Sequence, residues 1–446
     1  MRSRAYARVV VNQVDVEQVT RGRDGVDLMV GVDVGKFHCL ATGRWADARF
    51  ERPWKIDNPD AIAAFVVRLR RLKEGRKLVV AMEPSGTYGD ALRQALHDAG
   101  IPVVRISPKA AHDYAEIFDG APSQHDGKDA AVIAELAAIG KGSPWVYEPR
   151  SAWEQELSYW VDVMENRQRS RTVELGHLEA LLARHWPEAT RLLDVSSGTL
   201  LRVLEKYGGP AALAADPGAA RQLKRWGGPF LHPDKQAALL ASAAATMGVR
   251  QGDWDCRRMR DHATRARAAQ AEVVAARRRL KVLAKGHNVL EAQAKAVGVA
   301  TACVLWDALG DPRDYSCGRA YRKAMGLNLA ERSSGIYQGQ LKISKRGQPR
   351  TRQWLYLASL RLIRQSGVSR WYQAKKARDG NGAKRAVVAV MRKLALALYR
   401  VGAKGDAFEA ARLFRGVIAR TPKPPASGAA CGEAEAGIHA GVSAHP

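Results

Sequence analysis

Apolar residues come in short runs along the first third of the chain. The run 28–35 (LMVGVDVG) is apolar or glycine except for Asp33, which is typical of a buried strand. Further strands are predicted over FHCLATGRW, near residues 48–56, over 77–83 and over IPVVRIS. Helices are expected over DAIAAFVVRLRRLKEG, with Asn58 as a candidate N-cap, and over YGDALRQALHDAG, after Pro108 and over KDAAVIAELAAIG.

Strands that alternate with helices predict an α/β domain, which we place at residues 28–145. The first three strands follow one another too closely for helices to connect them. We therefore expect an antiparallel meander joined to later parallel strands in one mixed sheet. Residues 1–27 show no clear period and are expected to form an extension.

The rest of the chain is predicted to be mainly helical. Two long helices, 152–186 and 255–285, enclose a helical insert, which indicates a coiled-coil-like region over 150–288. A third domain is expected over 290–420, helical at both ends, with a Gly- and Ser-rich loop inside it. The Pro-, Ala- and Gly-rich tail, 421–446, is expected to be disordered.

The charge balance points to a polyanionic partner. The 446 residues include 71 Lys and Arg against 45 Asp and Glu, a net charge of +26, and nucleic acid is the obvious polyanion. A membrane surface is the competing partner. However, no stretch approaches the length of a spanning helix and no signal peptide is evident, so we expect a cytoplasmic, nucleoid-associated protein. Five cysteines without a C-x-x-C pair do not suggest a disulfide framework or a cysteine zinc site.

Basic residues concentrate in the second long helix and in KISKRGQPRTR. A charged helix face is as often merely solvated, but the excess of cations over acids favours contacts with phosphates. The candidate nucleic-acid-binding residues are Arg257, Arg258, Lys342, Lys345, Arg346, Arg350 and Arg352.

Four acids form a candidate metal site. They are Asp33 in the first strand, Glu83 at the end of a later strand, and Asp126 and Asp129 at the start of a helix. Glu83 alone is consistent with a solvated strand end, and the aspartates with favourable charges at a helix N-terminus. Asp33 is harder to dismiss, because a carboxylate in an apolar strand is costly to bury without a partner or a metal. Together the acids predict a site for one or two Mg²⁺ ions.

Three segments resemble conserved blocks of a known family. VGVDVGKFH, MEPSGTYGDAL and HDGKDAAVIAELA are similar to the blocks of the DEDD transposases of the IS110 insertion-sequence family. The resemblance implies an RNase H-like, RuvC-like first domain. It also implies that Asp33, Glu83, Asp126 and Asp129 are the catalytic, metal-binding carboxylates.

A second resemblance concerns the C-terminal domain. By itself, GLNLAERSSG reads as an ordinary turn of serines before a glycine. With ISKRG after it, however, it resembles the second conserved domain of the same family. That implies a nucleophilic serine, Ser334 with Ser333 in reserve, that forms a phosphoserine link to DNA. It further implies a bridge RNA that pairs with donor and target DNA. Separate domains for the metal site and the nucleophile permit composite sites shared between protomers, so we expect a homo-oligomer, a dimer or a tetramer.

We therefore expect a DNA transposase that cleaves and rejoins strands to excise and integrate an insertion sequence. One alternative is a structure-selective endonuclease of the Holliday-junction-resolvase type, which would use the same carboxylates with water but would not need residues 326–347. Another is a non-catalytic nucleic-acid-binding protein, which would leave Asp33 unexplained.

Overall fold

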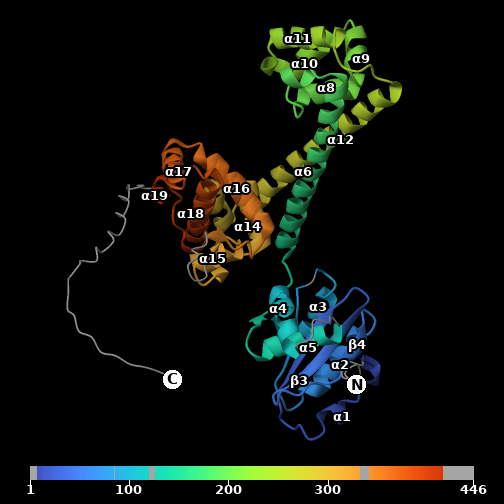
Figure 1. The fold of residues 1–446 in the computed structure, drawn as a ribbon, viewed down its shortest axis with the longest axis vertical. Coiled ribbons are helices and arrows are strands. Elements are labelled where there is room, and N and C mark those ends of the chain that lie inside the picture. The colour runs from blue at the N-terminus through green and yellow to red at the C-terminus, as the bar shows by residue number, and fades with distance from the viewer. Residues whose placement is uncertain (1–7, 85, 120–125, 332–340, 415–446) are drawn as a thin grey trace, which may run out of the picture. The chain divides into compact units, whose positions relative to one another are not determined.

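The computed structural model describes residues 8–84, 86–119, 126–331 and 341–414. The chain divides into two compact units, Met1–Pro149 and Arg150–Pro446, and each is described by itself (Figure 1). The expected disordered tail, 421–446, lies outside the described residues.

The first unit is built on a seven-stranded mixed sheet. In spatial order its strands are β1 (Val9–Val10), β4 (Trp54–Asp57), β3 (His38–Trp45), β2 (Leu28–Val34), β5 (Leu78–Met82), β6 (Val103–Arg105) and β7 (Ser143–Pro144). β2, β3 and β4 are antiparallel neighbours, whereas β5 and β6 run parallel to β2. The predicted mixed sheet is confirmed.

Helices cover both faces of this sheet. The helices of the first unit are α1 (Val16–Thr20), α2 (Ile62–Lys73), α3 (Asp90–Asp98), α4 (Pro108–Asp119) and α5 (Asp126–Ala138). Successive strand residues point to opposite faces. Val30 and Val32 pack with Phe65 of α2, whereas Met29 and its neighbours pack with Ile133 of α5.

From residue 8 onward, the N-terminal residues form part of the first unit's fold. β1 adds to the edge of the sheet, parallel to β4, and Val11 and Val16 are buried in the same core as α2. The expectation of an extension over 1–27 was wrong for this part. A two-residue strand followed by a 3-10 turn and one helical turn is too short to show a hydrophobic period.

Two long helices organise the second unit. α6 (Ala152–His185) begins with a capping box between Ser151 and Glu154, and α12 (Asp253–Ala284) packs along it. Leu157 packs in one cluster with Leu280, and Leu178 in another with Met259, so the helices are antiparallel. From Met259 to Leu283, buried residues of α12 recur at spacings of three or four, as in a coiled coil.

A helical insert packs around one end of this pair. It consists of α7 (Ala189–Leu192), α8 (Gly198–Tyr207), α9 (Pro210–Ala215), α10 (Ala219–Gly227) and α11 (Pro233–Ala244). Leu200 and Leu204 of α8 form a core with Leu178 and Leu182 of α6. The Gly-Pro pairs that interrupt the hydrophobic pattern coincide with the starts of α9 and the 3-10 turn Gly228–Phe230.

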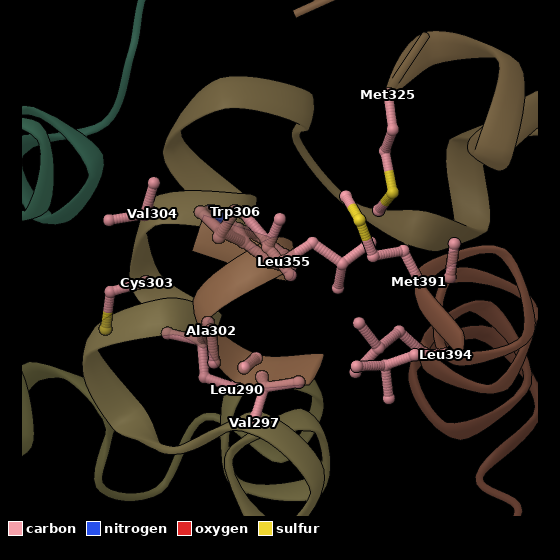
Figure 2. Packing of buried hydrophobic residues seen from close by; sticks show 14 of the residues in the cluster. Leu290, Val297, Ala302, Cys303, Val304, Trp306, Met325, Leu355, Met391 and Leu394 are labelled. Atoms are coloured by element: carbon pink, nitrogen blue, oxygen red, sulfur yellow. The ribbon is translucent and has the colours of Figure 1, made fainter. Parts of the chain in front are cut away.

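The other end of the pair joins the C-terminal helices. These elements are α13 (Asn288–Val297), α14 (Val299–Leu309), α15 (Gly318–Ala324), β8 (Leu329–Ala330), β9 (Lys342–Ile343), α16 (Pro349–Ile363), α17 (Ser366–Arg378), α18 (Ala383–Lys404) and α19 (Ala410–Leu413). Figure 2 shows part of their core, with Leu290, Trp306, Leu355 and Leu394 facing a common interior. Leu157 and Leu280 belong to this same core, so the regions that we expected as separate, 150–288 and 290–420, share it.

The second unit is thus mostly helical, as predicted. Its longest described helices, α6 and α12, are too polar to cross a bilayer, and none of the other helices in the described ranges combines the length and apolar character that crossing requires.

Candidate active site

Asp33 and Glu83 lie at the ends of neighbouring parallel strands. In the pairing of β2 with β5, Val32 lies opposite Met82, so the next positions along the two strands are Asp33 and Glu83. Asp33 is on the same face as Gly31 and Glu83 on the same face as Ala81, by the alternation of strand residues. That is the face that α5 covers. Two carboxylates far apart in the sequence therefore meet at the carboxyl edge of the sheet.

α5 brings a third carboxylate to this edge. A Cβ atom added to Gly31 would lie 2.1 Å from the carbonyl oxygen of Ala130 and 2.4 Å from the amide nitrogen of Ala134. The helix therefore crosses β2 in direct backbone contact, which only glycine permits. Asp129 immediately precedes Ala130, and Asp33 lies two residues beyond Gly31 along the strand.

The electrostatics show that the three carboxylates interact. Burial, together with the negative charges of Asp33 and Asp129, raises the pKa of Glu83 to about 7. All three residues are half-buried. Like charges that converge in a partly dehydrated place repel one another unless a cation joins them. This all-oxygen donor set fits a hard divalent cation such as Mg²⁺.

Asp126 is the first residue of α5, one turn before Asp129. A spacing of three residues allows both aspartates to share one helix face. Its side chain lies outside what the structure describes, so its place in the site remains a prediction from the sequence.

Two contacts fix the elements that carry the site. Arg44 of β3 forms a partly buried ion pair with Glu135 of α5, with Nη2 3.3 Å from Oε1. The Asn58 side chain donates to the carbonyl oxygens of Gly35 (3.0 Å) and Tyr88 (3.1 Å), which follow β2 and β5. Asn58 was expected to cap α2, but the N-cap is Ala61. Pro59 and Asp60 lie between Asn58 and this N-cap.

Lys128 is a buried charged residue beside the site that the sequence analysis did not single out. It lies in the first turn of α5, directly before Asp129, and only 1% of it is exposed. An ammonium is costly to bury without compensating groups, and Lys128 does have interaction partners in the structure. The sequence signal was a lysine at the start of the mostly apolar helix GKDAAVIAELAA.

The candidate nucleophiles, Ser333 and Ser334, lie outside the described residues. The structure does describe the two strands that flank them in the sequence, β8 and β9. β8 and β9 pair antiparallel, with Ala330 opposite Lys342, so the chain leaves and returns at one place. Arg352 secures the adjacent turn by donating to the carbonyl oxygens of Met325 (3.2 Å) and Gly347 (3.1 Å).

The expected nucleic-acid-binding residues of this domain divide into two groups. Lys342 and Lys345 line a cavity of about 700 Å³ between β9, α17 and α18 together with further cations, and Arg346 is exposed. Arg350, by contrast, contacts the carboxylates of Asp162 (3.1 Å) and Asp307 (2.7 Å) and also pairs with Glu165. Arg350 and Arg352 are thus engaged in contacts within the domain.

The basic helix α12 is also partly committed to intramolecular contacts. Arg257 pairs with Asp261 in the next turn (3.7 Å). Arg265, Arg267 and Arg279 pair with acids of α6 and α8. Arg258 is exposed, as are Arg277, Arg278 and Lys281. The expected phosphate-binding surface of α12 is therefore smaller than the count of its cations suggested.

Two family models match the chain. Residues 30–187, which contain all four acids, match a family model of DEDD transposases of the IS110 type, described as a transposase. Residues 292–376, which contain both serines, match the model described as "Transposase IS116/IS110/IS902 family". Together the matches span more than half of the chain. A search of curated proteins finds no match.

Both matches describe transposases, which are DNA-processing enzymes, and the first model is of the DEDD class. The chain belongs to the IS110 family of insertion-sequence transposases. DNA is accordingly its substrate.

Proposed function

We propose that this protein excises and integrates its insertion sequence with a magnesium site formed by Asp33, Glu83, Asp126 and Asp129 and with Ser334 as the nucleophile. The observation that carries the proposal is the convergence of Asp33, Glu83 and Asp129, which the register of β2 with β5 and the contact of α5 with Gly31 bring to one edge of the sheet. The sheet and helix arrangement supports an RNase H-like, RuvC-like assignment for the first unit.

The described carboxylates fit one or two Mg²⁺ ions. Bound there, Mg²⁺ would stabilise the negative charge that develops on the phosphate oxygens during strand cleavage. Asp33 and Glu83 hold their positions through the paired strands, and Asp129 through the contact between α5 and Gly31. Preorganised ligands of this kind need little rearrangement when substrate binds.

Ser334 would attack the scissile phosphate. A bond forms between its Oγ atom and phosphorus, the bond to one deoxyribose oxygen breaks, and that oxygen leaves as a hydroxyl group with the proton that the serine hydroxyl loses. Attack by the hydroxyl of a new strand on the phosphoserine reverses these changes and releases the serine. No high-energy cofactor is required, because each step exchanges one phosphoester for another.

The basic surfaces supply the nucleic-acid contacts in this proposal. Lys342, Lys345, Arg346 and Arg258 would bind phosphates of donor and target DNA and of a guide RNA, whose base pairing would read the sequence. A homo-oligomer, a dimer or a tetramer, and a nucleoid location in the cytoplasm complete the proposal.

The test is a denaturing gel for a covalent protein–DNA adduct. Purified protein with its co-purified RNA is incubated with matching DNA and Mg²⁺, as wild type, Ser334→Ala and Ser333→Ala. The proposal predicts an adduct in wild type and Ser333→Ala that disappears with Ser334→Ala or with chelator. Cleaved ends without an adduct in any protein would overturn the serine step and favour a resolvase-type nuclease. Unchanged activity after the co-purified RNA is digested by ribonuclease would contradict the role of a guide RNA.

A further inference from the structure

We propose that α6 and α12 carry a second metal site, for a transition-metal ion such as Zn²⁺, formed by Glu174, His177 and His262. One ligand atom from each of these residues lies within 4.8 Å of the others. The site belongs to the second unit and shares no residue with the carboxylates of the first.

The two helices present these residues to one point. Glu174 and His177 are three positions apart on α6, so their side chains lie on one face. His262 comes from α12, and its Nδ1 atom lies 2.5 Å from a carboxylate oxygen of Glu174. The rings of His177 and His262 have centroids 4.8 Å apart.

The surroundings are rigid and yet open on one side. Leu178 of α6 and Ala263 of α12, the neighbours of His177 and His262, are fully buried in the seam between the helices. The side chains of His262 and Glu174 are 12% and 18% exposed, whereas His177 is exposed to solvent. An ion can therefore reach donors that the coiled coil already holds together.

An interhelical ion pair is the competing explanation. Arg265 donates to Glu174 (3.1 Å) and also lies 2.9 Å from Nδ1 of His262. Although burial opposes it, hydrogen bonds from His262 and Arg265 lower the pKa of Glu174. The Arg265 side chain is 53% exposed and can turn into solvent. The ion pair does not involve His177, whereas the metal site uses His177 as a ligand.

The donor types select the ion. Two imidazoles and one carboxylate suit Zn²⁺, with water as a fourth ligand at tetrahedral geometry. Mg²⁺ prefers oxygen donors and therefore favours the first unit's carboxylates. Zn²⁺ bound between α6 and α12 would clip the two helices together and stabilise the fold by mass action.

The experiment titrates Zn²⁺ into full-length protein with excess Mg²⁺ present to occupy the carboxylates. Affinity is measured by calorimetry and stability by thermal melting, and Co²⁺ in place of Zn²⁺ reports the coordination geometry through its visible absorption. The variants are His177→Ala, His262→Ala and Arg265→Gln. His112→Ala, an exposed histidine of the first unit, is the matched control.

We expect about one Zn²⁺ per wild-type chain and a higher melting temperature on binding. His177→Ala and His262→Ala should lose at least tenfold in affinity, on the scale of a lost metal ligand. Arg265→Gln should bind as tightly or more tightly, because a competing cation is gone. Zn²⁺ affinity in His177→Ala equal to that of wild type would overturn the proposal, as would failure of wild type to bind. His177 is exposed, so this variant tests the site even if His262→Ala does not fold.

Discussion

Gly31 of β2 and Ala130 of α5 are in backbone contact that leaves no room for a side chain. A Cβ atom at position 31 would lie 2.1 Å from the carbonyl oxygen of Ala130. Asp33 follows Gly31 on the same strand face, and Asp129 directly precedes Ala130. One glycine thus sets how closely two of the carboxylates approach each other.

Replacing Gly31 with alanine should therefore separate α5 from β2. The added methyl group meets backbone atoms, which cannot turn aside as a side chain can. We expect a destabilisation of about 1–3 kcal/mol, typical of overpacking, and a loss of metal-dependent strand cleavage beyond what reduced stability explains. Urea unfolding and a DNA cleavage assay would measure the two effects.

Gly176→Ala is the matched control. Gly176 lies within α6, and a Cβ atom there would meet nothing within 4 Å. Alanine in a helix is more favourable than glycine by roughly 0.5–1 kcal/mol, so this variant should be as stable as wild type or more so. If Gly31→Ala behaved like Gly176→Ala, the close approach would not position the site.

Glu83 should make Mg²⁺ binding depend on pH near neutrality. Its pKa rises from 4.5 to about 7, so its contribution to stability is full below about pH 4.5 and is lost as pH rises through 7. A bound cation offsets that loss but must displace a proton at lower pH. The increase in melting temperature with Mg²⁺ should therefore be larger at pH 8 than at pH 6.

In Glu83→Gln this pH dependence should disappear. Glu116→Gln, which alters an exposed acid of α4, should keep it. An equal Mg²⁺ effect at both pH values in wild type would show that Glu83 does not bind the ion.

Asn58 should act by holding two loops in place. Asn58→Leu keeps the approximate size and branching of the side chain and adds no charge, but removes the NH₂ group that donates to Gly35 and Tyr88. Loss of these hydrogen bonds should cost about 1 kcal/mol or more and weaken Mg²⁺ binding. Calorimetry would measure the affinity for Mg²⁺. An unchanged affinity would show that Asn58 has only a structural role.

Arg350 and Arg346 should differ although both were expected to bind nucleic acid. Arg350→Ala leaves the nearly buried Asp307 with less compensation, which should destabilise the protein by about 2 kcal/mol. Arg346→Ala should leave the melting temperature unchanged. It should reduce the slope of DNA affinity against salt concentration by about the amount expected for one lost phosphate contact. The reverse pattern in melting and salt titrations would contradict these roles.

The central strands of the mixed sheet and the neighbouring positions of Asp33 and Glu83 could be predicted from the sequence, whereas the edge strand β1 could not. An acid inside the apolar run 28–35 and another at the end of 77–83 define strand positions, and neighbouring parallel strands bring such positions together. The role of Gly31 could not be predicted, because nothing in a glycine's sequence neighbourhood says which helix will cross it.

Contacts with partners far away in the chain could not be predicted from the local sequence. Arg350 looked like part of a basic segment, but its carboxylate partners, such as Asp162, come from α6 and α14. Asn58 preceded a helix and so resembled a cap, yet it contacts two distant loops. The local sequence shows the charge of a residue and its preference for a helix or strand, but the tertiary structure determines which residues it contacts.

The most direct test of the carboxylate site is the rate of DNA strand cleavage over a titration of Mg²⁺. Wild type is compared with Asp129→Asn, which keeps the side chain's shape but removes its charge, and with the control Glu116→Gln. We predict that Asp129→Asn slows cleavage by on the order of 10²-fold or more and needs more Mg²⁺, while the control matches wild type. Cleavage by Asp129→Asn at the wild-type rate, with the same Mg²⁺ dependence, would contradict the proposed site.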